Sequence, residues 1–330
     1  MPRPSRVSMA MVAARAGVSG QTVSRVANDS PHVDPETRAR VEAAMAELGY
    51  RPNRAARALR TGRSRTIGLV ATTLATVGNS RMLQSVAEAA AARGYALTVI
   101  TLGADGDIAE AFERLHDQGV DGAIVLNEAT AMVGRAGDAA GLQLVVVDSA
   151  PDGRFGVVAT DHAAGARAAV RHLLDLGHRT VHHLAGPAGS YAASERERGW
   201  REELADSGVP APEPLRGDWS SDSGHALMAS FPVGATALFA ANDQMALGAL
   251  QALAATGHDV PGAVSVVGFD DVTDAAHYRP ALTTVRQDFG GLGERAVRQL
   301  IAQIEQDAAP ADVRLPTELV VRASTARRHD

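Results

Sequence analysis

Acidic, amide and hydroxyl side chains stand at the ends of several short apolar runs in this chain. The residues in these positions are Thr72, Thr73, Asn127, Asp148, Asn242, Asp270 and Asp271. Carboxylates can transfer protons in an enzyme, and carboxylates and amides can also hold the hydroxyl groups of a bound ligand through hydrogen bonds. The side-chain types alone therefore leave an enzyme and a ligand-binding protein open.

The sequence lacks the motifs that accompany common kinds of catalysis. It has no Walker loop, no G-x-S-x-G elbow and no G-x-G-x-x-G opening a helix, since the glycines after Phe289 are spaced differently. The absence of cysteine excludes zinc fingers and disulfide frameworks. The histidines between residues 172 and 183 form no helical metal-binding pair with a nearby carboxylate. We expect no catalytic residues, no metal site and no cofactor.

Apolar runs alternate with alanine-rich segments of helical periodicity from Ile67 onwards. A first series contains the runs IGLVATT, YALTVITL, GAIVLN and LQLVVVD, and a second begins near Val157 and contains VHHLAG, ATALFA and VSVVGF. Two such series predict two doubly wound α/β subdomains, in which ligands bind beyond the carboxyl ends of the parallel strands. The polar residues named above stand at those ends, so we expect them to converge on a ligand crevice.

The first 50 residues carry the pattern of three short helices. We expect them near residues 9–16, after Ser19 and after Asp34, whose neighbour Pro35 suits a first helical position. Residues 51–65 are basic and have no apolar face wide enough to pack on a body, so they form either a flexible linker or a DNA-contacting helix. The sequence therefore predicts a helical domain over 1–50, a linker over 51–65 and an α/β core over 66–330.

Charge is divided unevenly along the chain. The formal net charge is −6, but residues 1–65 contain twelve arginines and five acidic residues and so carry +7, which leaves −13 on the remaining 265 residues. A basic head on an acidic body is typical of nucleic-acid-binding proteins. Ser8, Arg15 and Gly17 interrupt the stretch that a signal peptide needs, and no apolar run approaches the roughly 20 residues of a membrane span. We expect a cytoplasmic protein that binds nucleic acid and no membrane.

Two stretches in the head and five in the body form recognisable motifs. In the head they are AARAGVSGQTVSRVAN at 13–28 and VEAAMAELGYRPN at 41–53, which continues through NRAARALRTGRSRTIGLV. In the body they are AGP at 185–187, GDWS at 217–220, ANDQMALGAL at 241–250, SVVGFDD at 265–271 and LTTVRQDF at 282–289. From about Ser8 to Val321 the chain thus resembles the LacI/GalR family of transcriptional repressors. The resemblance implies a helix-turn-helix DNA-binding head, a hinge helix within 51–65, and an effector-binding and dimerisation core like that of periplasmic binding proteins.

The resemblance also implies how the head contacts operator DNA. The second helix of such a head enters the major groove, where Gln21 can pair with adenine and Arg25 with guanine, since the two lie four residues apart on one helical face. Gly20 departs from the residue type expected at a base-reading position, which leaves the operator sequence open. Phosphate contacts are implied for Ser19, Thr22, Ser24, Asn28, His32, Thr37, Tyr50 and Asn53.

The hinge segment is implied to bend DNA. Leu59 matches a leucine that wedges between base steps in the minor groove and kinks the duplex. Two hinge helices must meet for this, so we expect the active form to be at least a dimer. Because the sequence stops at ASTARRHD, soon after the last expected strand, we expect a homodimer rather than a tetramer.

In the core, the resemblance implies a site for a sugar effector. The matched residues are Thr72, Asn127, Asp148, Arg196, Trp219, Asn242, Asp270, Gln287 and Phe289. Carboxylates and amides bind vicinal hydroxyls, an arginine can bridge two of them, and an aromatic ring covers the apolar C–H face of a sugar. On the side that holds the non-sugar group, Thr76, Gly78, Asn79 and Met82 replace a more apolar wall, and Ala104 stands where the matched pattern has an arginine. A galactoside is the leading effector, and another glycoside or a free sugar stays open.

An enzyme and a periplasmic sugar-binding protein are the rival interpretations. The first lacks a motif, and the second would need a signal peptide and no basic head. We therefore expect a repressor in which sugar binding reorients the subdomains, separates the hinge helices and lowers operator affinity, so that operator equally weakens sugar binding. A corepressor, which some members of the family use, would reverse the sign of this coupling, and both signs stay open.

Overall fold

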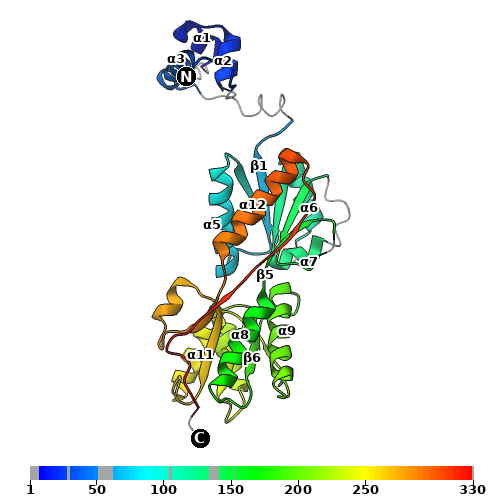
Figure 1. Cartoon of the computed structure of the whole chain (residues 1–330), viewed down its shortest axis with the longest axis vertical. Coiled ribbons are helices and arrows are strands. Elements are labelled where there is room, and N and C mark those ends of the chain that lie inside the picture. Colours follow the sequence, from blue (N-terminus) through cyan, green and yellow to red (C-terminus); the bar gives the residue numbers. More distant parts are fainter. Residues whose placement is uncertain are drawn as a thin grey trace. The chain divides into compact units, whose positions relative to one another are not determined.

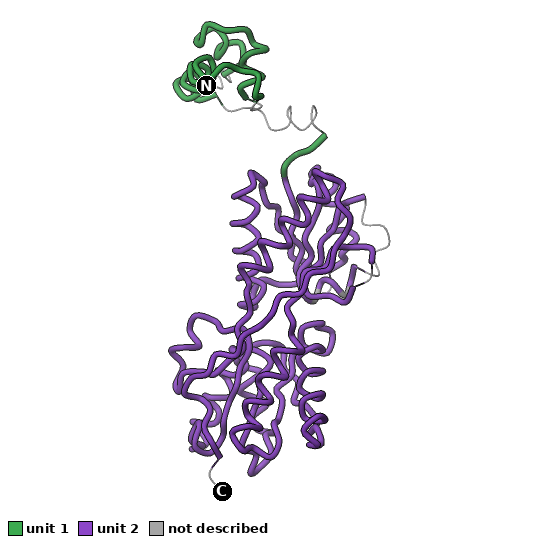
Figure 2. The backbone as a smooth tube through the Cα atoms, in the orientation of Figure 1, with its two compact units in different colours: residues 1–65 green, residues 66–330 purple. Residues whose placement is uncertain are grey.

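The computed structural model describes residues 7–27, 30–50, 62–103, 106–133, 141–151 and 153–328. The chain forms two compact units, residues 1–65 and 66–330, which Figure 2 distinguishes by colour. The division falls at the carboxyl end of the expected linker, of which residues 51–61 lie outside the described ranges. None of the helices within those ranges is both long and apolar enough to cross a membrane.

The head unit contains the three helices that the sequence predicts. They are α1 (Met9–Ala16), α2 (Gly20–Ala27) and α3 (Pro35–Leu48). The side chains of Ser8 and Asp34 cap α1 and α3 by accepting backbone N–H groups of the first turn. Gly17 and Gly49 end the same two helices with φ of 66° and 65°, a left-handed conformation that glycine adopts without strain. Local signals therefore fix both ends of these helices.

The three helices of the head pack around a small valine core. Val12, Val23 and Val41, one from each helix, are completely buried. Val26 joins them from α2 and is 5% exposed. Because α2 turns this apolar side inward, its polar side chains are left facing solvent.

The amino-terminal subdomain of the core unit is a parallel sheet of six strands with helices on both faces. The order is β11-β5-β4-β3-β1-β2, with bounds β1 (Thr66–Ala71), β2 (Ala96–Thr101), β3 (Gly122–Leu126), β4 (Gln143–Val147), β5 (Gly156–Thr160) and β11 (Asp312–Leu315). Helices α5 (Val77–Ala92) and α12 (Phe289–Gln306) cover one face, and α6 (Ile108–Asp117) covers the other (Figure 1). The short elements η1 (Asn127–Ala129) and α7 (Thr130–Val133) follow β3.

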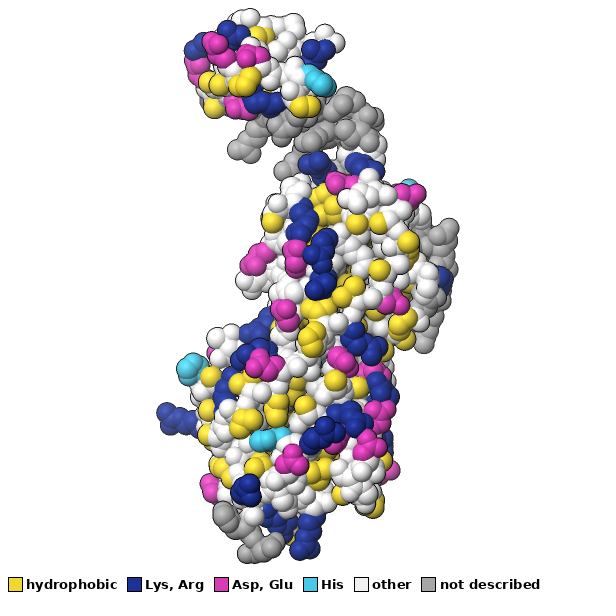
Figure 3. All heavy atoms as spheres, in the orientation of Figure 1, with side chains coloured by type: hydrophobic (Ala, Val, Ile, Leu, Met, Phe, Trp, Pro, Cys, Tyr) yellow, Lys and Arg dark blue, Asp and Glu magenta, His cyan; other side chains and the backbone are white. Residues whose placement is uncertain are grey.

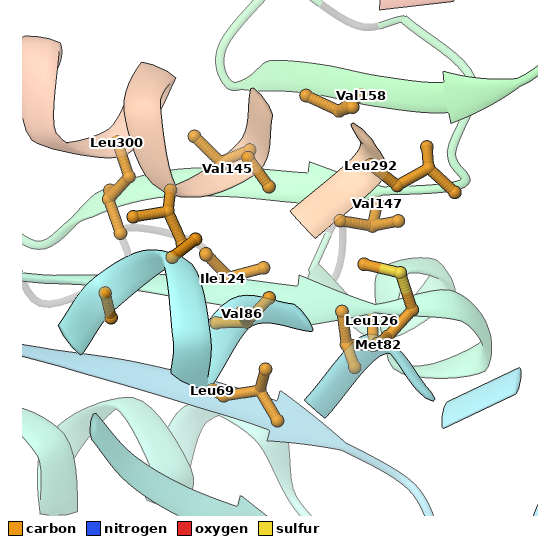
Figure 4. Close-up of a cluster of buried hydrophobic side chains, with 14 of the residues drawn as sticks. Leu69, Met82, Val86, Ile124, Leu126, Val145, Val147, Val158, Leu292 and Leu300 are labelled. Atoms are coloured by element: carbon orange, nitrogen blue, oxygen red, sulfur yellow. The ribbon is translucent and has the colours of Figure 1, made fainter. Parts of the chain in front are cut away.

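Branched aliphatic side chains fill the layer between this sheet and its covering helices. Leu69, Ile124 and Val145 point from three strands toward Val86 of α5 and Leu300 of α12 (Figure 4). All five are completely buried. Strands covered on both faces must be apolar on both sides, which explains the unbroken apolar runs in the sequence.

The carboxyl-terminal subdomain repeats this plan with one antiparallel edge strand. The order is β12-β10-β9-β8-β6-β7, with bounds β6 (His182–Ala185), β7 (Leu215–Arg216), β8 (Ala237–Ala240), β9 (Ser265–Asp270), β10 (Thr283–Arg286) and β12 (Glu318–Val320). β12 is antiparallel to β10, and the other pairs are parallel. Helices α8 (His162–Asp175) and α9 (Tyr191–Asp206) pack on one face, and α10 (Ser221–Leu227) and α11 (Asp243–Ala255) pack on the other. Two short elements, η2 (Met228–Ser230) and η3 (Thr273–His277), complete it.

Within residues 153–328 the chain passes between the two sheets three times, after β5, after β10 and after β11. The run near Val157, which the sequence pattern places at the start of the second series, belongs instead to the first sheet, so that prediction is wrong. That run is β5, which pairs with β4 and β11 in the amino-terminal sheet. Apolar periodicity reveals a strand but not its partners, because pairing depends on contacts between distant parts of the chain.

Ion pairs line the surface of the carboxyl-terminal subdomain. Arg198 of α9 binds Glu195 and Glu202 on the same helix, each at 2.7 Å. Arg171 of α8 binds the buried Glu203 of α9 through two hydrogen bonds of 2.7 and 2.8 Å. Figure 3 shows positive and negative side chains intermixed on the visible face of the core unit.

Candidate functional site

A pocket lies between the two subdomains of the core unit, at the carboxyl ends of parallel strands from both sheets. It is lined by Thr76, Gly78, Met82, Asn127, Asp148, Ala192, Arg196, Trp219, Asn242, Asp270, Gln287, Phe289 and Leu292. The cavity measures about 40 Å³, which is room for a few water molecules. A ligand in this pocket would contact residues of both subdomains at once.

The backbone adopts an unusual conformation at several of the lining residues. Asn127, Asp148 and Asp270, at the ends of β3, β4 and β9, have φ of 45°, 55° and 108°, and Trp219 has 75°. Positive φ in a residue other than glycine costs of order 1–3 kcal/mol and persists where surrounding contacts impose it. Backbone strain is therefore concentrated around the pocket, as is common at binding sites.

Arg196 brings a buried positive charge to the pocket. Its side chain projects from α9 and is 5% exposed, with Nη2 at 3.3 Å from Asp270 Oδ1. Nη1 donates to the carbonyl oxygen of Ala241. The guanidinium lies over the rings of Phe269 and Trp219, with its central carbon 3.9 and 5.4 Å from the two ring centroids. A carboxylate, a carbonyl and two aromatic faces together compensate this charge.

Hydrogen bonds connect acidic residues from the two subdomains through the crossover segments. Gln287 Nε2 donates to Asp270 Oδ1 at 2.6 Å, and the Thr160 hydroxyl donates to Gln287 Oε1 at 2.8 Å. The backbone N–H of Thr160 donates in turn to Asp148 Oδ1 at 3.0 Å. The two carboxylates are thus held by one continuous chain of donors and acceptors.

The two buried carboxyl groups differ in acidity. Burial raises the pKa of Asp148, but the neighbouring His162 and the N–H of Thr160 outweigh burial and leave the pKa below its ordinary value. Burial also raises the pKa of Asp270, and Arg196 and Gln287 offset this only in part, so that its pKa stays above the ordinary value.

Asn242 and Trp219 hold each other at the entrance to α11. Asn242 caps the helix by accepting the Met245 N–H at 2.9 Å, and its amide donates to the carbonyl oxygen of Trp219 at 3.0 Å. The indole of Trp219 lies against Gly186, where an added Cβ would come within 2.4 Å of a ring carbon. Glycine at 186 therefore makes room for a flat aromatic wall.

The structure brings together eight of the nine residues that the sequence assigned to an effector. They are Asn127, Asp148, Arg196, Trp219, Asn242, Asp270, Gln287 and Phe289. Thr72 is not among the lining residues, and its carbonyl oxygen accepts the Gly103 N–H at 2.9 Å. Of the expected facing wall, Thr76, Gly78 and Met82 line the pocket. Asn79 is buried beside it and binds the Thr73 carbonyl and Asn127, whereas Ala104 lies outside the described residues.

Sequence reasoning missed residues that support the pocket from behind. Thr160 and His162 are 3% and 1% exposed and contact Gln287, Asp148 and Arg196. Thr160 ends β5 and His162 follows it by two residues. The same strand-end rule that selected Asp148 could therefore have found them. The small Ala192 and the core-facing Leu292 carried no such signal.

In the head, the expected base-reading residues lie on the exposed side of α2. Gln21 and Arg25 are exposed, and Gly20 begins the helix. Ser19 caps it by accepting the Thr22 N–H at 3.1 Å, and the two hydroxyls lie 2.9 Å apart. The other described phosphate candidates are exposed or half-buried, namely Ser24, His32, Thr37 and Tyr50. Asn28, Asn53 and Leu59 lie outside the described residues.

A second cavity of about 560 Å³ lies at the opposite edge of the carboxyl-terminal sheet, near the amino ends of β8 and β9. Its walls include Met228, Phe231, Leu253 and Val264, which are apolar. Charged and amide groups do not converge there as they do in the smaller pocket. Among the described side chains, no group of three or more His, Asp or Glu could hold a metal ion.

Both parts of the chain match known protein families. Residues 8–53 match the model of bacterial regulatory proteins of the lacI family, and residues 170–325 match the periplasmic binding protein-like domain. The lactose operon repressor of Escherichia coli (strain K12) is 37% identical over 97% of this chain and 91% of its own length. The transcriptional regulator CelR of Thermobifida fusca is 37% identical over 98% of this chain and 100% of its own length. The ribose operon repressor of E. coli (strain K12) is 33% identical over 91% of this chain and 93% of its own length.

Solved structures show the same relationship. The lac repressor dimer bound to operator and the anti-inducer ONPF superposes with a TM-score of 0.86, at 36% identity over 97% of this chain and 99% of that chain. The CelR–cellobiose complex gives a TM-score of 0.73, at 36% identity over 97% of this chain and 100% of that chain. These relatives are transcriptional regulators, and their likeness extends over the head and both subdomains. This chain belongs to the LacI family of bacterial transcriptional repressors.

Proposed function

We propose that this repressor is released from its operator when a sugar binds between the two subdomains of its core. The observation that carries the proposal is the convergence of eight sequence-assigned residues on one interdomain pocket. They supply buried carboxylates, amides, a guanidinium and an aromatic wall, the groups that sites for polyhydroxylated ligands use. Ligand binding rather than catalysis accounts for this combination.

The lining favours a glycoside over a free sugar. One part of it is strongly polar and the other is apolar, the latter made by Gly78, Met82, Phe289 and Leu292. A ligand with a hydroxyl-rich ring and a less polar substituent suits both parts. We propose a galactoside as the first effector to test, with cellobiose as the alternative suggested by the CelR complex.

The position of the pocket links binding to movement. A sugar bound there would contact groups of both subdomains, so it would favour the arrangement of the subdomains that suits those contacts. Asp148 belongs to the amino-terminal subdomain, whereas Arg196 and Asp270 belong to the other. The amino-terminal subdomain begins at Thr66, directly after the linker, so its displacement would be transmitted to the hinge. A coupling free energy of about 1–3 kcal/mol is typical of such systems.

Arg81 links the amino-terminal subdomain to the residues that follow the pocket residue Asp270. From α5 its guanidinium donates to the carbonyl oxygen of Asp271 at 3.3 Å and to the Thr273 hydroxyl at 2.8 Å. Asp271 follows the pocket residue Asp270 directly. A change in the arrangement of the two subdomains would therefore strain or break this link.

We further propose the division of roles along the chain. Residues 1–50 bind operator, 51–65 form the hinge and 66–330 bind the effector and form a homodimer, as the lac repressor dimer does. Base contacts are assigned to Gln21 and Arg25, and the hinge wedge to Leu59. Operator DNA lies in the bacterial cytoplasm, which places the working protein there.

Replacing Asp270 with alanine is expected to abolish the sugar response and leave operator binding intact. The variant removes the carboxylate that holds both Arg196 and Gln287. Operator titration with and without lactose and cellobiose measures this, and Asp117→Ala, at an exposed position of α6, is the matched control. Loss of DNA binding with sugar affinity retained would refute the site.

Replacing Arg25 with alanine is expected to weaken binding to operator by about 1–3 kcal/mol, because a base contact is lost. Binding to random DNA should change far less at the same salt concentration. Arg15→Ala is the control, since Arg15 pairs with Glu47 at 2.6 Å within the head. An equal loss on operator and random DNA would mean that Arg25 holds phosphate instead.

Replacing Arg81 with methionine is expected to weaken operator binding without sugar and to tighten sugar binding, each by up to about tenfold. The variant keeps the aliphatic stem but removes two hydrogen bonds to the other subdomain, which together contribute roughly 1 kcal/mol. These bonds stabilise the observed arrangement of the two subdomains. Arg93→Met is the control, because Arg93 binds Glu294 within one subdomain. Identical titrations for the two variants would exclude a coupling role for Arg81.

A further inference from the structure

His162 stands behind the pocket, at the point where the chain crosses into the carboxyl-terminal subdomain. It is the first residue of α8, is 1% exposed and is not among the lining residues. Its Nε2 lies 3.0 Å from Asp148 Oδ1, a contact whose direction falls short of a hydrogen bond, and no other described group completes a hydrogen bond with it. Its Nδ1 lies 3.3 Å from Arg196 Nε. One imidazole thus touches both charged groups that the pocket offers from opposite subdomains.

The two neighbours select one protonation state of this ring. The Nε–H of arginine can only donate, so Nδ1 of His162 must carry a lone pair to accept it. The ring proton then resides on Nε2, whose nearest charged acceptor is the Asp148 carboxylate at 3.0 Å. A proton on Nδ1 would instead oppose the guanidinium N–H. The neutral Nε2–H form is the state that serves both contacts.

His162 also closes a ring of polar contacts around the site. From Asp148 the chain of hydrogen bonds runs through Thr160 and Gln287 to Asp270. Asp270 meets Arg196 at 3.3 Å, and His162 connects Arg196 back to Asp148. Four members of this ring line the pocket, and the other two, Thr160 and His162, hold them from behind.

We propose that His162 is a positioning residue of the effector site, which in its neutral Nε2–H form aligns the Asp148 carboxylate and the Arg196 guanidinium for the hydroxyl groups of one sugar ring. The inference rests on the proposed function of the pocket. It adds that the two charged groups reach the ligand as one aligned pair and that an imidazole with a fixed proton sets their alignment.

The test compares variants of the full chain by calorimetric titration with lactose, cellobiose and ribose. His162→Phe keeps a ring but loses both nitrogens, and we expect about 10- to 100-fold weaker binding of the sugar that the parent chain binds. His162→Gln can restore the donor to Asp148 and should recover most of that loss. Binding by His162→Phe equal to that of the parent would overturn the proposal.

His183→Phe separates positioning from a general effect on the core. His183 is also 1% exposed in the same subdomain, but its Nδ1 lies 2.9 Å from the Phe239 carbonyl oxygen and its ring stacks on Phe239. We expect this control to lower the thermal midpoint while sugar affinity stays unchanged. Equal losses of sugar affinity in both phenylalanine variants would reduce His162 to a packing role and contradict the proposal.

A spectroscopic measurement tests the proton position without any sugar. Imidazole ¹⁵N shifts of the ligand-free chain, with the His162 signals assigned by their loss in His162→Phe, should show Nε2 protonated and Nδ1 unprotonated. A proton on Nδ1 would overturn the inference. If no sugar binds the parent chain, the proposed function fails, and the spectrum still decides whether His162 carries its proton on Nε2, as the inference requires.

Discussion

A guanidinium buried between two subdomains is the constraint on which the effector site depends. A charge removed from water must be matched by partners, since the penalty of leaving it unpaired amounts to several kcal/mol. Arg196 meets Asp270, the Ala241 carbonyl, His162 and two aromatic rings. Removing one partner leaves the others incompletely satisfied, so these residues behave as a unit. A ligand that offers hydroxyl groups to this unit changes the balance for all of them.

This arrangement gives a small ligand contacts with two subdomains at once. The polar ring includes side chains from both sheets and from the crossover segments after β5 and β10. Arg81 connects the same region to α5. In the proposed function, sugar binding shifts the core to a second arrangement of its subdomains. Two packings of one core, rather than a gradual deformation, are the expected response.

Much of this fold and site follows from the sequence. Caps such as Asp34 with Pro35 are local signals, and the rule that ligands bind at the carboxyl ends of parallel strands placed Asp148 and Asp270 correctly in one pocket. The pairing of β5 with β4 and β11 was not predictable, because strand partners depend on contacts between distant segments. Thr72 shows the limit of the rule, because it also follows a strand but is not among the residues that line the pocket. His162 lies two residues after the end of β5, so the strand-end rule could have selected it, but a lone histidine gives no sequence pattern that shows which groups it contacts.

The most direct measurement is an operator titration at fixed salt, using DNA from upstream of the neighbouring genes, with and without lactose and cellobiose. Salt must be constant because phosphate contacts make the affinity strongly dependent on ionic strength. The account predicts tight, sequence-dependent binding without sugar and roughly 5- to 150-fold weaker binding when the effector is present. Operator affinity that is the same in the absence and presence of every sugar that binds the core would contradict it.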